Sequence, residues 1–168
     1  MIPYQTPEKI KLKYDAIKAP KDYWKGKTVL DVGCCEGMLY PLLEGCKYIG
    51  LDNSPEYIES ARKRYPDAKF VLGNMKELDI EADIIISLST LHILDDQEFE
   101  AFIKNSTRLT KELIFECPVK GSSPIYHTRT EKQLEEICRK YYKNFTEIGI
   151  SPSPHDIQST RKVFRCEN

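Results

Sequence analysis

Short runs of branched apolar residues alternate along the chain with stretches in which apolar residues recur every three or four positions. The runs predict buried β-strands, and the amphipathic stretches predict helices. We expect strands over residues 27–32, 47–51, 69–72, 83–88, 112–117, 145–151 and 161–166, and helices over 8–18, 38–44, 55–64, 95–108 and 130–142. Pro118 is expected to end the fifth strand. This alternation is typical of a parallel sheet with helices on both faces.

The length of 168 residues is typical of one domain, so we expect a single domain over residues 1–168 with residues 1–26 as an N-terminal helical cap. Hydrophobic residues make up 40% of the chain, and no apolar run approaches the roughly 20 residues that cross a bilayer. The first residues lack a secretory signal, so we expect a cytoplasmic protein without membrane contact. The six cysteines are scattered, which predicts reduced thiols packed as small apolar side chains.

Charge is balanced overall but uneven along the chain. The formal net charge is −1, which argues against nucleic acid as the principal partner. Seven lysines in the first 30 residues, at positions 9, 11, 13, 18, 21, 25 and 27, face only Glu8, Asp15 and Asp22, a local charge of +4. A solvated face of an amphipathic helix accounts for these lysines, and a basic patch that holds phosphates is the alternative.

The strongest motif is Val29-Leu30-Asp31-Val32-Gly33-Cys34-Cys35-Glu36-Gly37, a hydrophobic strand that leads into an acidic residue and a glycine-containing turn. Such a turn brings bare backbone against a ligand at the carboxyl end of a sheet. It resembles the first motif of class I methyltransferases, Asp-x-Gly-x-Gly-x-Gly. Asp31, Gly33 and Gly37 match that motif, and Cys35, beside Cys34, stands at the middle glycine. The resemblance implies that this turn binds S-adenosylmethionine.

Three further segments match this family in order. Asp52 ends the second predicted strand 21 positions after Asp31, and Asn53 follows it. The resemblance implies that the Asp52 carboxylate accepts both ribose hydroxyls of the cofactor. Asn74 and Met75 follow the third strand, where the family contacts the adenine amino group and packs on the ring.

The fourth match is the strand that begins at Asp83. Its end, Ser87 and Leu88, resembles the segment whose backbone contacts the methionine part of the cofactor. The family resemblance also implies a doubly wound, mostly parallel seven-stranded α/β sheet of order 3-2-1-4-5-7-6 with an antiparallel last strand. A nicotinamide-binding domain would instead need glycines at positions 35 and 38 after Gly33, where Cys35 and Met38 stand.

The candidate catalytic residue is His92, four residues beyond Leu88 at the edge where substrate should enter. Alignment alone can supply roughly 7–11 kcal/mol to a methyl transfer, so a general base is optional. His127 and His155 map to the same edge, and each histidine could equally have a structural role. Tyr14, Tyr126 and His127 are candidate substrate-binding residues. With Tyr4 and Arg129, the tyrosines could form a lid, or they could pack in the core.

The sequence leaves several functions open. The three histidines with Asp95, Asp96, Asp156 or Glu116 could compose a metal site, but no ligand spacing supports one, so we expect none. The leading hypothesis is methyl transfer to oxygen or nitrogen of a small molecule. Ser87-Leu88-Ser89-Thr90 replaces the Asn-Pro-Pro-Tyr type of motif, which disfavours exocyclic base amines as acceptors.

Two alternatives stay open beside that hypothesis. One is an RNA methyltransferase that holds phosphates through the N-terminal lysines, Arg161, Lys162 and Arg165. The other is a non-catalytic cofactor-binding module that activates a partner, motivated by Cys35 in the glycine turn. The methyl acceptor and the oligomeric state are left undetermined by the sequence.

Overall fold

A computed structural model describes residues 6–120, 126–151 and 160–168. Across these residues the chain forms strands β1 (Thr28–Val32), β2 (Lys47–Asp52), β3 (Lys69–Leu72), β4 (Ile84–Leu88), β5 (Glu112–Lys120), β6 (Asn144–Ser151) and β7 (Thr160–Glu167). The α-helices are α1 (Pro7–Ile17), α2 (Pro55–Arg64), α3 (Asp96–Leu109) and α4 (Glu131–Cys138), and short 3-10 turns are η1 (Tyr40–Leu42), η2 (Met75–Glu77) and η3 (Leu91–Ile93).

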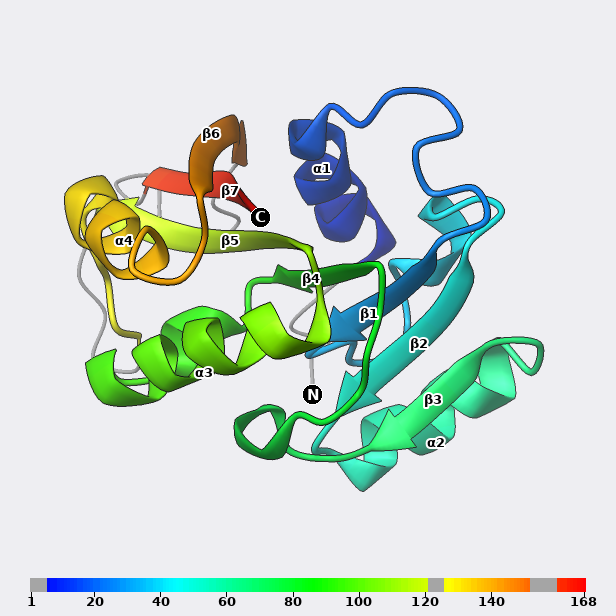
Figure 1. Cartoon of the computed structure of the whole chain (residues 1–168). Helices are drawn as coiled ribbons and strands as arrows, with labels where there is room; N and C mark the ends of the chain where they lie inside the picture. The colour runs from blue at the N-terminus through cyan, green and yellow to red at the C-terminus, as the bar shows by residue number, and fades with distance from the viewer. Residues whose placement is uncertain (1–5, 121–125, 152–159) are drawn as a thin grey trace.

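The strands form one sheet of order β3-β2-β1-β4-β5-β7-β6 (Figure 1). The first five strands pair in parallel, and β7 lies antiparallel to both β5 and β6. The predicted strand order and the antiparallel last strand are therefore confirmed. The chain order reverses between β1 and β4, which makes the carboxyl ends of these two strands the topological switch point where ligands bind in open α/β sheets.

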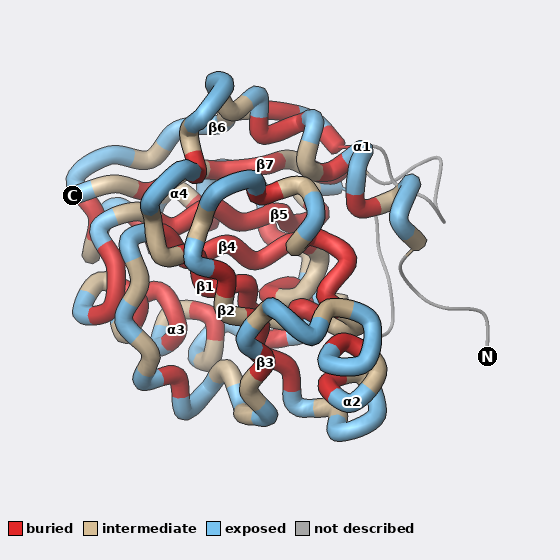
Figure 2. The backbone as a smooth tube through the Cα atoms, turned by 90° about the vertical axis from the view of Figure 1, so that its right-hand side faces the viewer, coloured by how far each residue is buried: buried red, intermediate tan, exposed pale blue. Residues whose placement is uncertain are grey.

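Two apolar layers hold the helices to the sheet, and the central strands β1, β4 and β5 between them are buried along most of their length (Figure 2). Consecutive strand residues point to opposite faces. Leu30 packs in the layer with α3 and α4, while its neighbour Val29 packs in the layer with α1 and α2. Each fully buried aliphatic or aromatic side chain contributes roughly 1.5–3 kcal/mol from its removal from water.

The helices begin at side-chain caps, as the sequence predicts for Ser54 and Thr130. The Ser54 hydroxyl accepts a hydrogen bond from the Tyr57 backbone N–H at 3.3 Å, and Pro55 occupies the first turn of α2. Asp95 and Glu98 form a reciprocal capping box at the start of α3. These caps fix where each helix leaves the loops at the carboxyl edge of the sheet.

Three predicted boundaries are wrong. The helix expected over 38–44 shrinks to the turn η1, because the positive-φ residues Gly37 and Gly45 confine it and Pro41 lacks a donor. Pro118 does not end β5, which continues to Lys120. The pairing of β5 with β7 shifts register between Pro118 and Lys120, so the sheet continues although proline has no backbone N–H to donate. The last helix ends at Cys138 and not near residue 142.

Helix α1 packs against β6 and β7 (Figure 1). The contact is close, because a Cβ atom on Gly149 of β6 would overlap the Ala16 backbone carbonyl of α1. Lys13 on this helix is only 4% exposed, so the expectation of a fully solvated lysine face is wrong at this position. All six cysteines are free thiols, as predicted. Within the described residues, no helix has the length and apolarity needed to cross a membrane.

Candidate functional site

A pocket with a cavity volume of about 190 Å³ lies at the switch point. Its walls come from the segments that follow four neighbouring strands. They are Gly33 and Cys35 after β1, Leu51, Asp52, Asn53 and Tyr57 at the end of β2 and in α2, Gly73 and Met75 after β3, and Ser89, Thr90 and Ile93 after β4. The order of strands in the sheet, and not their order in the chain, therefore builds this pocket.

The glycine turn after β1 needs its unusual backbone. Gly33 has φ 78°, and a Cβ atom there would overlap the Thr90 side chain. Cys35 also adopts a left-handed conformation with φ 48°, which L-residues adopt at a cost of roughly 1–2 kcal/mol. The turn thus presents backbone to the cavity where the segments that follow β1 and β4 are in close contact.

Asp52 ties this turn to the second strand. Its Oδ2 atom accepts a hydrogen bond from the Cys35 backbone N–H at 2.9 Å, and its Oδ1 atom accepts one from the Ser54 backbone N–H at 3.0 Å. An ionised carboxylate has about four acceptor sites. Each Asp52 oxygen therefore keeps a lone pair for a ligand in the cavity.

Five of the predicted cofactor residues meet at the cavity, namely Gly33, Cys35, Asp52, Asn53 and Met75. The other six, Asp31, Cys34, Gly37, Asn74, Ser87 and Leu88, are not among the residues that line the cavity, and their cofactor-binding roles stay predictions. The Ser87 hydroxyl, for example, is buried and donates to the Val32 carbonyl at 3.0 Å, which joins β4 to β1. Asn74 caps η2 by accepting from the Lys76 backbone N–H.

Asp31 lies beneath the turn and is fully enclosed. Its carboxylate accepts a hydrogen bond from the Tyr48 hydroxyl at 2.7 Å. Burial raises the pKa of Asp31 to about 7; the negative charge of Asp52 acts in the same direction, and the Tyr48 hydrogen bond opposes it. Asp31 therefore carries a proton over much of the acidic range and supports the turn from below.

The cavity also contains residues that the motif comparison missed: Leu51, Tyr57, Gly73, Ser89, Thr90 and Ile93. Gly73 and Ser89 each follow the last residue of a predicted strand directly, and that position is a usable signal in a parallel sheet. Tyr57 and Ile93 had no such signal, because a helical turn brings them to the cavity from beyond the strand end.

Next to this pocket lies a buried polar network around Glu116, at the carboxyl end of the parallel part of β5. Arg161 of β7 binds both Glu116 oxygens, with Nη2 to Oε2 at 3.0 Å. The Ser89 and Ser151 hydroxyls donate to the same carboxylate at 2.5 and 2.7 Å. Burial raises the pKa of Glu116, but the Arg161 guanidinium outweighs burial and lowers it to about 2. Glu116 is therefore ionised at neutral pH.

His92 joins this network from η3. Its side chain is buried, its Nδ1 atom lies 3.3 Å from Arg161 Nη2, and its ring packs edge-on against the Tyr126 ring at 4.3 Å between centroids. Burial lowers the pKa of His92, and the positive charge of Arg161 adds to this, giving about 3. The His127 backbone N–H donates to the His92 carbonyl at 2.8 Å, while the His127 side chain is exposed.

The structure separates the remaining candidates. Tyr14 accepts a hydrogen bond from the Trp24 indole at 2.9 Å and packs on the α1 face of the sheet, and its substrate role stays a prediction. Tyr4 and His155 lie outside the described residues. In the parts of the chain that the structure describes, no three His, Cys, Asp or Glu side chains gather closely enough to hold a metal ion.

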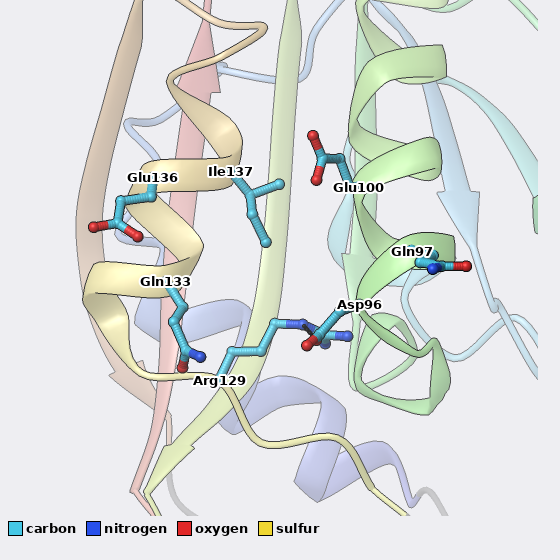
Figure 3. Close-up of a pocket in the computed structure, with 7 residues that line it drawn as sticks. All are labelled: Asp96, Gln97, Glu100, Arg129, Gln133, Glu136 and Ile137. Carbon is cyan, nitrogen blue, oxygen red and sulfur yellow. Dashed lines mark hydrogen bonds and ion pairs between the residues drawn. The ribbon is translucent and has the colours of Figure 1, made fainter.

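A second hollow of about 230 Å³ lies between α3 and α4 (Figure 3). It is lined by Asp96, Gln97, Glu100, Arg129, Gln133, Glu136 and Ile137. Buried Arg129 extends toward Asp96, and its Nε atom donates to that carboxylate at 2.9 Å. This hollow lies between helix faces and has no glycine turn, so we assign the functional site to the switch-point pocket.

Comparison with known proteins agrees with this site. The family model described as a methyltransferase domain matches residues 29–112, half of the chain, from the second residue of β1 through all of β2, β3 and β4. The chain therefore belongs to the class I S-adenosylmethionine-dependent methyltransferases. No curated protein sequence matches it.

Solved structures share the fold at low sequence identity. Magnesium protoporphyrin IX methyltransferase from Synechocystis PCC 6803, with bound S-adenosylhomocysteine, has a TM-score of 0.79 and 16% identity over 96% of this chain and 84% of its own. A protein of Pyrococcus horikoshii OT3 has a TM-score of 0.70 and 19% identity over 95% and 89%. Mitomycin 7-O-methyltransferase has a TM-score of 0.71 and 16% identity over 96% and 54%.

Proposed function

We propose that this chain binds S-adenosylmethionine in the switch-point pocket and transfers its methyl group to an oxygen or nitrogen atom of a small-molecule acceptor. The observation that carries this proposal is the arrangement of Asp52. Its two oxygens accept hydrogen bonds from the Cys35 and Ser54 backbone N–H groups, and each oxygen still has a lone pair that can accept a further hydrogen bond. Two neighbouring ribose hydroxyls match that pair of acceptors. The carboxylate thus fits the sugar of the cofactor.

The other walls suit the rest of the same ligand. Met75 and Ile93 offer apolar surface for the adenine ring, and Ile93 is 49% exposed despite its apolar side chain. The backbone of Gly33 and Cys35 would border the methionine part. When bound, the cofactor supplies a sulfonium methyl group that is already electrophilic, so the chain's own contribution is to bind, align and exclude water.

Several features favour a small acceptor over RNA. The three C-terminal cations that could hold phosphates are each paired with glutamates: Arg161 with Glu116, Lys162 with Glu131 and Glu147, and Arg165 with Glu112. These pairs neutralise the C-terminal cations of the RNA alternative, which also required the N-terminal lysines. Two proteins with similar structures, magnesium protoporphyrin IX methyltransferase and mitomycin 7-O-methyltransferase, are named for small-molecule substrates.

The non-catalytic alternative rested on Cys35. The turn accommodates this residue at φ 48°, and its backbone N–H bonds to Asp52, so the side chain does not disrupt the site. Free thiol chemistry at Cys35 is disfavoured, because burial and the negative charge of Asp52 raise its pKa to about 12.

The test is turnover. The purified chain, with S-adenosylmethionine, is incubated with separate panels of phenols, carboxylic acids and amines, and with total RNA, and the S-adenosylhomocysteine formed is quantified. We expect product with at least one small-molecule panel, abolished by Asp52→Ala and unaffected by the exposed Asp67→Asn. Product with RNA alone would overturn the choice of acceptor, and cofactor binding without any product would favour the non-catalytic module.

A further inference from the structure

The contact between Arg161 and His92 fixes which ring nitrogen carries a proton. A guanidinium group has N–H donors and no acceptor. Arg161 Nη2 lies 3.3 Å from His92 Nδ1 in a buried environment. Nη2 has two hydrogens and three acceptors near it, Glu116 Oε2, the Ser89 hydroxyl and His92 Nδ1, so one hydrogen is shared between the last two. Nδ1 can enter this contact only as an acceptor. It then carries no proton, and a neutral imidazole has its single proton on Nε2.

Arg161 cannot easily turn away from this contact. Its Nε and Nη2 atoms bind the two oxygens of Glu116, and Nη2 also donates to the Ser89 hydroxyl at 3.2 Å. Planar bidentate pairs of this kind have little rotational freedom. Breaking the pair would leave a buried charge without a partner, which is strongly unfavourable. The guanidinium thus keeps a fixed position next to Nδ1 of His92.

The charges around His92 act in the same direction. The ring is faced by Arg161 on β7, Glu116 on β5, Lys13 on α1 and Arg129 ahead of α4, with Tyr126 and His127 alongside. Three of these groups are cations and one is an anion. Protonation of His92 would add a positive charge to a buried region whose net charge is already positive. The neutral form of the ring is therefore favoured.

We propose that Arg161 is a positioning residue that holds His92 as a neutral imidazole protonated on Nε2, so that His92 does not serve as a general base. This revises the expectation that His92 removes a proton from the acceptor. Any hydrogen bond made through Nε2 is one that His92 donates, which suits an acceptor molecule with an oxygen lone pair, such as a carboxylate or carbonyl.

The position of the Arg161–His92 contact, next to the cofactor pocket, connects it to methyl transfer. Ser89 lines the cofactor pocket and donates to the Glu116 carboxylate that holds Arg161, and Thr90 and Ile93 of the His92 segment line the same cavity. The catalytic consequence rests on the proposed function. The protonation state of His92 does not, because it follows from contacts within the chain.

The first test is nitrogen NMR of the imidazole rings in the ¹⁵N-labelled full chain, with His92 assigned by its loss in His92→Gln. We expect His92 to show an unprotonated Nδ1 and a protonated Nε2 from about pH 5 to 8, a range in which free imidazole titrates. A proton on Nδ1, or titration of His92 within this range, would overturn the proposal. Because neither cofactor nor acceptor is needed, this outcome is independent of the proposed function.

A variant then tests the cause. The double substitution Glu116→Gln and Arg161→Gln removes both charges together and leaves no unpaired ion, so it avoids the penalty of either single change. We expect the preference for a proton on Nε2 to weaken, because a glutamine amide at position 161 can accept as well as donate at Nδ1. The pKa of His92 should change little, because the two charges removed act on it in opposite directions and burial remains. An unchanged His92 spectrum in the folded variant would show that Arg161 does not set its state. If this variant does not fold, the wild-type spectrum still decides the proposal.

Enzyme activity distinguishes a His92 that donates a hydrogen bond from a His92 that only supports the structure. With an acceptor from the panel, His92→Gln retains an amide N–H donor, whereas His92→Leu has none. We expect the glutamine variant to stay within about tenfold of wild type and the leucine variant to lose at least about tenfold more, the worth of one hydrogen bond. The pH profile of kcat/KM should keep its shape in His92→Gln. Loss of an acidic limb in that variant would identify His92 as a base.

Discussion

Substituting Asp52 with asparagine probes the central contact of the cofactor pocket with almost no change in volume. The carboxylate accepts backbone N–H groups of Cys35 and Ser54 on its two oxygens. An asparagine has one oxygen and one NH₂ group, so the NH₂ must face a backbone donor or turn into the cavity. Either orientation removes a charged acceptor from the ribose position.

The magnitude follows from the hydrogen bonds that change. A hydrogen bond to a charged group contributes about 1.5–3 kcal/mol, and one between neutral groups about 0.5–1.5 kcal/mol. The variant loses one charged bond to the cofactor and weakens the other to a neutral one, a total of about 2.5–4.5 kcal/mol. At 1.4 kcal/mol per factor of ten, the Kd should rise roughly 60- to 1,600-fold.

Isothermal titration calorimetry with S-adenosylhomocysteine measures this change. Asp67→Asn is the matched control, because Asp67 is exposed on the turn before β3 and away from the pocket lining. Thermal unfolding of both variants shows whether the fold is kept. A folded Asp52→Asn variant whose Kd stays within about threefold of wild type would refute the assignment of the ribose to this carboxylate.

Three further predictions concern the frame of the site. Cys35→Gly should change the free energy of unfolding by less than about 1 kcal/mol and keep cofactor affinity, whereas Cys35→Val, branched at φ 48°, should lose more than about 1 kcal/mol; urea unfolding and calorimetry measure both. Asp31 has a raised pKa of about 7 in the folded state. The native state therefore holds a proton that the unfolded state releases, and stability falls as pH rises between about 4 and 7, by up to about 1.4 kcal/mol per pH unit. Asp31→Asn should abolish this slope in urea unfolding, and an equal slope in both proteins would contradict the protonated state. Gly149→Ala should displace α1 through overlap with the Ala16 carbonyl, cost about 1–3 kcal/mol and speed hydrogen exchange in α1; unchanged exchange there would contradict the packing.

Local patterns were sufficient for the part of the site built by β1 to β4. The spacing between Asp31 and Asp52, the glycines of the first turn and the residues after β3 are features of short segments. The Ser54 cap is local too, since a side chain and a backbone group three residues apart decide it. Errors arose where neighbours in space decided the outcome. β5 continues past Pro118 because β7 pairs with it and accommodates the bulge.

The sequence by itself determined the fold class, the strand order that its family shares, and Asp52 as a pocket residue, because turn chemistry and hydrophobic periodicity act over a few residues. Only the tertiary structure decided that Lys13, His92, Glu116 and Arg161 share one buried network, and hence which ring nitrogen of His92 accepts a hydrogen bond. Charges buried at the ends of distant strands interact strongly because water is excluded there, and the sequence pattern carries no information about that proximity.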